Sequence, residues 1–253
     1  MVQGLTEFLP VSSSGHLILV PWLFDWTELT RNPELNQAFD VALHMGTFVG
    51  ALAYFWRDLL RLVLRDRRLG ALLLLSAVPG AVVGALLNSA LEDHSGAEWL
   101  IGVLLVVFGL VLLWADRLKG ERGEDDFGMR EALLMGAAQA AALQPGVSRS
   151  GATISMARKL GFERDTAARL SFLMSIPIIA GAGLYEGLNL AADGGIPPGF
   201  GTAFVVGIVT SGITGFAAVW ALMRYIRTRS FLPFVSYRVV AGVAVVLIAA
   251  VRA

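Results

Sequence analysis

The sequence contains no cysteine, and this absence removes several classes of function. Disulfide bridges, thiol nucleophiles and zinc or iron–sulfur sites with cysteine ligands are all excluded. Charged residues are also scarce: Asp, Glu, Lys and Arg make up 16% of the 253 residues, against roughly 25% in a soluble domain. The formal net charge is zero and the pI is about 6.8, so nothing indicates a nucleic-acid partner.

The sequence contains long stretches without charged residues. Residues 70–91 and 194–223 carry no charged side chain, and the mean hydropathy of the chain is +0.67. A membrane-spanning helix needs about 20 apolar residues, so each stretch is long enough to cross a bilayer. Strand-like alternation of apolar and polar residues is not found. We therefore predict an all-α integral membrane protein with six transmembrane helices, at residues 38–56, 70–91, 98–115, 166–190, 199–222 and 234–251.

The connections between these helices differ in basic residues. The connections at 91–98 and 191–200 contain no Lys or Arg, whereas those at 116–130 and 224–229 do. Arginine is most concentrated in the connection at 57–68, which contains Arg57, Arg61, Arg65, Arg67 and Arg68. Because cytoplasmic loops of membrane proteins are enriched in Lys and Arg, the basic connections are expected inside the cell and the others outside.

The first hydrophobic segment is interrupted by polar residues. It reads QGLTEFLPVSSSGHLIL from Gln3 to Leu19 and contains one carboxylate, Glu7, three consecutive serines and one imidazole, His16. Pro10 removes a backbone donor and Gly15 loosens the chain, so a continuous helix is not expected here. Irregular backbone at membrane depth is tolerated only where protein or a water-filled cavity covers it. The sequence thus predicts a re-entrant hairpin of two half-helices that faces a cavity.

A second interrupted segment, at 132–160, repeats the first. It contains QPGVSRSGATI, and a shift of 136 residues aligns Gln3 with Gln139, Val11 with Val147, Ser12 with Ser148, Ser14 with Ser150, Gly15 with Gly151 and Ile18 with Ile154. On the predicted topology the two hairpins enter from opposite sides, which makes an inverted-topology repeat. We predict one membrane domain, 1–253, with halves at about 1–115 and 132–253 joined by a cytoplasmic loop at 116–131.

The two interrupted segments together supply the groups of an anion site. Arg149 is the one cation in these two loops, and a guanidinium binds phosphate through paired hydrogen bonds. The serines and glycines are expected at helix starts, where free backbone N–H groups bind phosphate. Glu7 could ligate a divalent cation or act as a base, and His16 could transfer a proton or attack phosphorus. Simpler roles are open: Glu7 could orient the serine loop, and Arg149 could hold loop carbonyls. We interpret His44 as structural and paired with Asp40, one helical turn earlier.

Four stretches of the sequence are similar to a known protein family. QGLTEFLPVSSSGH and PGVSRSG, with FWRDLL at 55–60 and RLSFLMSIPIIAGA at 169–182, resemble the undecaprenyl pyrophosphate phosphatase family, the bacitracin-resistance type of membrane phosphatase. The resemblance implies hydrolysis of undecaprenyl pyrophosphate to undecaprenyl phosphate and inorganic phosphate. It also implies a divalent cation, Mg²⁺ or Ca²⁺, a place in the bacterial plasma (inner) membrane, and a contribution to peptidoglycan synthesis and bacitracin resistance.

The resemblance also implies roles for individual residues. The acidic motif falls on Gln3 and Glu7, which would bind the metal, and Gln3 departs from the glutamate often found there. The catalytic set would be Glu7, Ser13, His16 and Arg149, with the nucleophile left open between His16, Ser13 and water. Substrate-binding groups would be Ser12, Ser14, Gly15, Ser148, Ser150 and Gly151. Only Met1 and Val2 precede the first motif, so we expect an upstream segment or an internal start.

The predicted function is thus a membrane phosphatase acting on a polyprenyl pyrophosphate among membrane lipids, with its active site opening toward the outer, periplasmic face. A polyprenyl-phosphate flippase is the alternative, because inverted repeats with broken helices are also a transport architecture. Transport needs the Arg149 clamp, whereas hydrolysis also needs a metal or an acid–base partner such as Glu7 or His16. A homodimer is compatible with the sequence.

Overall fold

A computed structural model describes residues 1–26, 33–92, 98–192, 196 and 199–252 of the chain. Within these residues the structure is helical and contains no β-strand. The elements are α1 (Val2–Phe8), α2 (Ser13–Leu23), α4 (Pro33–Leu64), α5 (Arg67–Glu92), α6 (Glu98–Arg117), the 3₁₀ turn η1 (Glu124–Asp126), α7 (Met129–Ala141), α8 (Arg149–Lys159), α9 (Arg164–Ala192), α10 (Gly201–Ile226) and α11 (Leu232–Arg252). The predicted all-α class is confirmed.

The six predicted transmembrane helices are α4, α5, α6, α9, α10 and α11. Each is long and apolar enough to cross a membrane. The predicted extent of the arginine connection at 57–68 is wrong, because α4 continues to Leu64. No glycine or proline interrupts residues 51–68, and leucine and arginine are strong helix formers, so nothing ends the helix earlier. Arg57 and Arg61 therefore lie on the last turns of α4 rather than in a loop.

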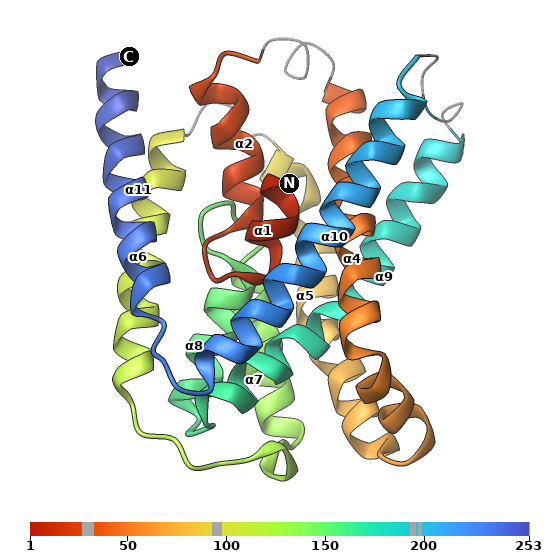
Figure 1. Ribbon diagram of the computed structural model, residues 1–253, viewed down its shortest axis with the longest axis vertical. Helices are drawn as coiled ribbons and strands as arrows, with labels where there is room; N and C mark the ends of the chain where they lie inside the picture. Colours follow the sequence, from red (N-terminus) through yellow and green to blue (C-terminus); the bar gives the residue numbers. More distant parts are fainter. Residues whose placement is uncertain (27–32, 93–97, 193–195, 197–198, 253) are drawn as a thin grey trace.

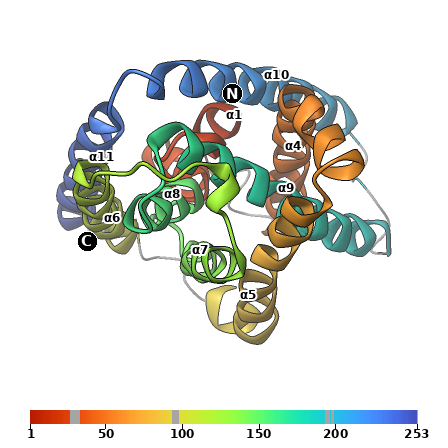
Figure 2. The same cartoon turned by 90° about the horizontal axis from the view of Figure 1, so that it is seen from below.

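The long helices surround the two interrupted segments. Seen along the bundle, α10, α11, α6, α5, α9 and α4 form an incomplete ring, with α1 and α8 inside it and α7 between α5 and α6 (Figure 2). Each interrupted segment packs against a long helix from the other half of the chain. Helix α1 of the first segment packs on α10, and α7 of the second packs on α5. Each interrupted segment is therefore held by the other half of the chain. Re-entry of both segments from opposite membrane faces stays a prediction.

Glycine allows the first segment to approach its neighbour closely. A Cβ atom on Gly4 would lie 1.9 Å from Thr214 Oγ1 and 2.6 Å from the Ser211 carbonyl oxygen on α10. At Gly50 on α4 a Cβ would lie 2.5 Å from the Gly212 carbonyl oxygen. Small residues at such contacts let helix backbones pack together inside a membrane. Helices α1 and α4 are thereby seated against α10, which fixes the position of the residues at the end of α1.

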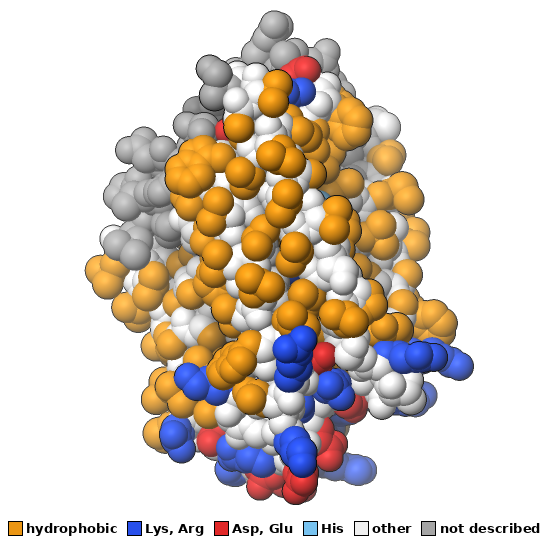
Figure 3. Space-filling model, turned by 90° about the vertical axis from the view of Figure 1, so that its left-hand side faces the viewer, with side chains coloured by type: hydrophobic (Ala, Val, Ile, Leu, Met, Phe, Trp, Pro, Cys, Tyr) orange, Lys and Arg blue, Asp and Glu red, His pale blue; other side chains and the backbone are white. Residues whose placement is uncertain are grey.

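Charged side chains gather at one end of the molecule. On the face formed by α6 and α11, apolar side chains cover the middle and upper parts, and Lys, Arg, Asp and Glu lie below them (Figure 3). The connections α4–α5, α6–α7 and α10–α11 all lie at this end (Figure 1). Ion pairs join the α6–α7 connection to α4 and α9: Glu124 of η1 pairs with Arg61 and Arg169, and Arg169 also pairs with Asp58. This distribution supports a multi-pass membrane protein.

Candidate active site

The two interruptions share one backbone design. Ser12 caps α2 with φ 75° and ψ 91°, and Ser148 caps α8 with φ 72° and ψ 114°. In both caps the serine Oγ accepts a hydrogen bond from the backbone N–H three residues later, at Gly15 and at Gly151. Positive φ is uncommon for a residue with a side chain, so the same strained cap at positions 136 residues apart supports the internal repeat.

Hydrogen bonds join the two loops directly. Ser12 Oγ also accepts from the Gly146 N–H at 3.1 Å, and Ser150 Oγ donates to the Leu9 carbonyl at 3.1 Å. The side chains of Ser12 and Ser150 are therefore engaged in holding the loops together, and neither lines the cavity described below. The loops form one unit, which brings the start of α2 next to the start of α8.

Arg238 of α11 adds a third connection between the loops. Its side chain is fully buried, and its guanidinium donates to the carbonyl oxygens of Pro10 at 3.1 Å, Gly146 at 2.9 Å and Val147 at 3.0 Å. It donates further to the Leu105 carbonyl of α6 at 3.1 Å. Sequence reasoning missed this residue, although an arginine inside a predicted span is itself a signal of function.

Glu7 is surrounded by donors from both segments. Its Oε2 accepts hydrogen bonds from Gln3 Nε2 at 2.9 Å and from Ser13 Oγ at 2.6 Å, and its Oε1 is paired with the Arg149 guanidinium. His44 Nε2 lies 3.6 Å from Oε2. The Glu7 side chain is 4% exposed and that of Arg149 is 19% exposed. The structure thus brings together Gln3, Glu7, Ser13 and Arg149, as predicted.

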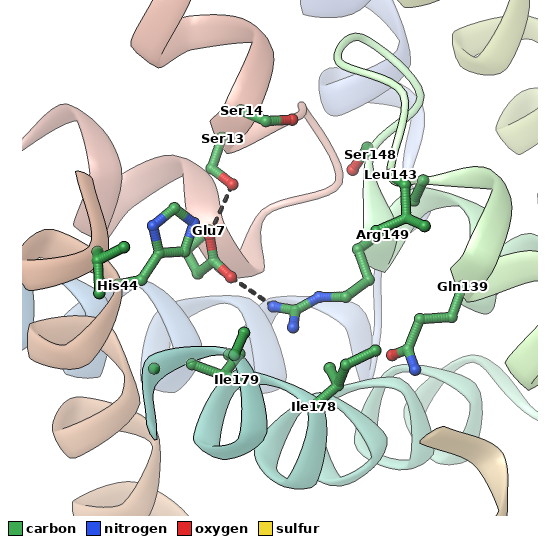
Figure 4. Close-up of a pocket in the computed structure, with 14 residues that line it drawn as sticks. Glu7, Ser13, Ser14, His44, Gln139, Leu143, Ser148, Arg149, Ile178 and Ile179 are labelled. Carbon is green, nitrogen blue, oxygen red and sulfur yellow. Dashed lines mark hydrogen bonds and ion pairs between the residues drawn. The ribbon is translucent and has the colours of Figure 1, made fainter. Parts of the chain in front are cut away.

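A cavity of about 320 Å³ lies beside this ion pair. Glu7, Ser13 and Ser14 line it from the first segment, and Ser148 and Arg149 from the second (Figure 4). The starts of α2 and α8 both border the cavity, so two helix N-termini contribute partial positive charge there. The remaining lining is mainly apolar and comes from α4, α9 and the end of α7, with Val41, Leu143, Ile178, Ile179 and Ala182.

Gly15 and Gly151, predicted to bind substrate, lie where a side chain would contact neighbouring atoms closely. A Cβ atom on Gly15 would lie 3.2 Å from Ile101 Cγ2 and 3.4 Å from the Gly146 nitrogen. On Gly151 it would lie 2.9 Å from Arg238 Nη1. Both positions permit the close approach of the two loops and of Arg238. Neither glycine lines the cavity beside Glu7 and Arg149.

His16 points away from the cavity that Glu7 and Arg149 share. Its Nδ1 is 2.7 Å from the Ser12 carbonyl oxygen, and its Nε2 is 2.6 Å from the Tyr237 hydroxyl. The imidazole stacks on the Tyr237 ring with centroids 5.6 Å apart. His16 lines a different cavity of about 500 Å³, between α1, α2, α4 and α10. The structure therefore separates His16 from the other predicted catalytic residues.

His44, and not His16 as predicted, is the histidine that lies beside Glu7 and Arg149 in the structure. It lines the cavity with Glu7 and Arg149, and its side chain is 34% exposed (Figure 4). The predicted pairing with Asp40 takes another form, because the His44 Nδ1–H donates to the Asp40 backbone carbonyl at 2.8 Å. The sequence predicts a structural role for His44 and does not indicate that it lines the cavity, as the structure shows. His44 reaches the cavity because α4 packs against α1. No local sequence pattern predicts this packing.

The comparisons with known proteins agree with this site. The family model described as bacitracin resistance protein BacA matches residues 1–244. The chain belongs to this family. Two relatives named undecaprenyl-diphosphatase, from Desulforudis audaxviator and Pelotomaculum thermopropionicum, are 48% and 45% identical to it over 261 aligned residues, covering 100% of this chain and 96% and 95% of theirs. A third, from Moorella thermoacetica, is 42% identical over 98% of this chain and 94% of its own.

Membership in the BacA family agrees with the architecture described above. The match begins at residue 1 and includes both interrupted segments and all six long helices up to residue 244. Because the relatives align over nearly their whole length, the shared region is the complete membrane bundle and not one motif. Both loops of the candidate site are therefore part of what this chain shares with the BacA family.

Proposed function

We propose that this BacA-family protein hydrolyses undecaprenyl pyrophosphate to undecaprenyl phosphate and inorganic phosphate in the cavity between the two interrupted segments. The observation that carries the proposal is the Glu7–Arg149 pair, which joins a carboxylate from the first segment to a guanidinium from the second inside a partly apolar cavity. The names of the three relatives describe the same reaction. Recycling of the lipid carrier for peptidoglycan synthesis and resistance to bacitracin would follow from it.

Arg149 is the group we assign to the terminal phosphate. A guanidinium binds phosphate oxygens through paired hydrogen bonds, and its charge opposes the negative charge that spreads over the phosphoryl oxygens during transfer. The partial positive charge at the starts of α2 and α8 acts in the same direction. When substrate arrives, its phosphate replaces Glu7 as the partner of Arg149, so the buried guanidinium stays paired.

Glu7 is then free to accept a proton. Ser13 Oγ already donates to its Oε2 at 2.6 Å, which is the arrangement of a nucleophile beside a general base. Either Ser13 or a water held in its place can attack the terminal phosphorus while Glu7 takes the proton. The bond from that phosphorus to the bridging oxygen breaks, and polyprenyl phosphate leaves. After attack by Ser13, water hydrolyses the phosphoserine and releases inorganic phosphate. His16 would first have to leave Tyr237 and turn toward the other cavity, so we place it outside the chemical step. Acid quench during a single turnover distinguishes a phosphoserine at Ser13 from attack by water.

We propose that a divalent cation takes part, and the donor atoms near Glu7 fit one. No group of three or more His, Cys, Asp or Glu side chains that could hold a metal is found in the described part of the chain. One carboxylate is nevertheless sufficient for Mg²⁺ when substrate phosphates supply other ligands. Glu7 would provide that carboxylate, and Gln3 Oε1 is a buried oxygen without a hydrogen-bond partner. The cation would neutralise charge on the pyrophosphate oxygens.

The apolar part of the cavity suits the lipid end of the substrate. Ile178, Ile179 and Ala182 of α9 and Val41 of α4 lie next to the polar groups, so a polyprenyl chain can leave between helices. We propose that the cavity opens toward the outer face of the inner membrane. The first segment lies toward the end of the molecule opposite to the basic connections, which the positive-inside rule assigns to the cytoplasm (Figure 1).

Hydrolysis is preferred here to transport. The three relatives reported above carry the name of a diphosphatase, and the serine–carboxylate hydrogen bond between Ser13 and Glu7 serves chemistry rather than anion binding alone. The test is the products that the purified full-length chain forms in detergent from a polyprenyl pyrophosphate. With Mg²⁺ or Ca²⁺ we expect equal amounts of inorganic phosphate and polyprenyl phosphate, and with a chelator we expect neither. A folded protein that forms no phosphate with either cation would contradict the proposal.

A further inference from the structure

Gln139 is a buried side chain whose hydrogen-bonding groups are unused. It lies on α7 with 2% of its surface exposed, and neither its Nε2 nor its Oε1 has a hydrogen-bond partner. Among the described residues, Gln139 alone has both a buried donor atom and a buried acceptor atom without a hydrogen-bond partner. A buried polar group without a partner lowers the stability of the folded protein. Such a group calls for an explanation, and a ligand is one.

The surroundings of Gln139 show where that ligand would lie. Its side chain lines the cavity that Glu7 and Arg149 share, and it extends from α7 toward Ile178 of α9 (Figure 4). On its other side is α5, where a Cβ atom on Gly80 would lie 3.9 Å from Gln139 Nε2. Ile178 and Gly80 offer the amide no polar side chain. The cavity is therefore the direction from which a partner can reach it.

The internal repeat relates Gln139 to a residue that does have a partner. In the first segment Gln3 donates to Glu7, four residues later, at 2.9 Å. The shift of 136 residues that relates the segments places Gln139 at the position of Gln3 and Leu143 at the position of Glu7. The second segment therefore has the same amide but an apolar side chain where the first segment has the carboxylate. Both Gln139 and Leu143 line the cavity.

The position of Gln139 differs from that of the ion pair. In Figure 4 Glu7 and His44 lie on one side of the cavity, Gln139 and Leu143 lie on the other, and the Arg149 side chain extends between them. A pyrophosphate has two phosphates to bind. If the terminal phosphate is attacked beside Glu7 and Ser13, the lipid-linked phosphate lies farther from Glu7, next to the apolar lining that accepts the polyprenyl chain.

We infer that the Gln139 amide donates a hydrogen bond to the lipid-linked phosphate of the substrate, with Arg149 between the two phosphates. This inference rests on the proposed function and adds the binding site of the phosphate that stays on the lipid. Gln139 then recognises the polyprenyl phosphate product as well as the substrate. Inorganic phosphate, which comes from the terminal position, does not contact it.

The test compares two inhibitors of the wild-type and Gln139→Met full-length proteins in detergent. Methionine keeps the length of the side chain and removes its polar atoms. We expect the inhibition constant of polyprenyl phosphate and the KM of polyprenyl pyrophosphate to rise by about 10-fold or more, because a hydrogen bond to a charged oxygen is lost. The inhibition constant of inorganic phosphate stays unchanged. The melting temperature of Gln139→Met does not fall, since no hydrogen bond within the protein is removed.

Gln3→Met is the matched control for stability. It removes the same amide from the equivalent position of the first segment, where Nε2 donates to Glu7, so its melting temperature should fall. A Gln139→Met protein with a lowered melting temperature and unaltered inhibition constants would overturn the inference and make Gln139 structural. Equal increases in both inhibition constants would overturn the assignment to the lipid-linked phosphate. A wild-type protein that cleaves no polyprenyl pyrophosphate would instead contradict the proposed function.

Discussion

At the scale of single residues, the site depends on one buried charge pair. The Glu7 carboxylate accepts from Gln3, Ser13 and Arg149, so its negative charge is fully compensated by donors. Burying the two charges is costly, and each stabilises the other only while both are present. Stability and activity should therefore respond differently when the charges are removed one at a time or together.

Arg149→Ala tests this dependence. The substitution leaves the Glu7 carboxylate buried and unpaired, which should destabilise the protein by about 3–5 kcal/mol and lower its melting temperature. Adding Glu7→Gln removes the unpaired charge and keeps an acceptor for Ser13, so the double variant should regain most of the melting temperature. Its turnover of polyprenyl pyrophosphate should stay lost. A double variant as unstable as Arg149→Ala would show that the ion pair does not govern stability here.

His16→Asn tests whether the imidazole has a chemical or a structural role. Asparagine places an amide N–H where His16 Nδ1 lies, so it can still donate to the Ser12 carbonyl oxygen. We expect this variant to keep kcat/KM within about 10-fold of wild type, since one hydrogen bond of the usual net strength, that to Tyr237, is lost. His16→Ala removes both bonds and should lower the melting temperature further. An inactive His16→Asn protein that melts like wild type would restore His16 to the chemical step.

At the scale of elements, the two interrupted segments act as one unit because Arg238 joins them. Its guanidinium contacts carbonyl oxygens of both loops and of α6, and its charge has no carboxylate partner among these contacts. The loop carbonyls, of Pro10, Gly146 and Val147, precede Ser12 and Ser148, the two caps that direct α2 and α8 toward the cavity. Arg238 is thus a positioning residue for Ser13 and Arg149.

Arg238→Lys should reduce kcat more than it raises KM. Lysine has a single side-chain nitrogen, whereas Arg238 donates from Nε, Nη1 and Nη2 at separate positions, so the loops shift relative to each other and buried acceptors lose their donors. The matched control is Arg158→Lys, because Arg158 is also buried and also donates to carbonyl oxygens, those of Leu118 and Phe162, away from the cavity. We expect the control to lose melting temperature but not kcat. Equal kcat in both variants would contradict the positioning role.

The helices were predictable from sequence because they depend on local properties. Apolar stretches with few charged residues indicate the six spans, and Pro10 with the following serines indicates the first interruption. The second interruption followed from its match to the first. The arginines after Trp56 suggest a loop and so an early end to α4, although their aliphatic stems and neighbouring leucines suit a helix near a membrane surface.

The site was predictable only where its residues sit in a motif. Gln3, Glu7, Ser13 and Arg149 were identified from the two segments and lie together. His44, Gln139 and Arg238 reach the loops or the cavity from α4, α7 and α11, and their roles depend on how these helices pack. Motif proximity does not tell which way His16 faces, since a residue one turn into α2 can face either side of the helix, and the structure places it at a different cavity from Glu7.

At the scale of the whole molecule, the position of the cavity relative to the membrane faces can be measured. The chain has no cysteine, so a single cysteine reports its own environment. In intact cells an impermeant thiol reagent should label Ser14→Cys, which lines the cavity, and should not label Asp125→Cys in the α6–α7 connection. Permeabilised cells should label both. Labelling of Asp125→Cys alone in intact cells would reverse the proposed orientation.

The central claim is that one catalytic site is built from both interrupted segments. Its most direct test is the turnover of polyprenyl pyrophosphate by Glu7→Gln, from the first segment, and Arg149→Lys, from the second, with Arg158→Lys as the folded control. We predict that each site variant loses about 100-fold or more in kcat, the effect of removing one group that stabilises a transition state. Wild-type turnover in either site variant, with an unchanged melting temperature, would contradict the account.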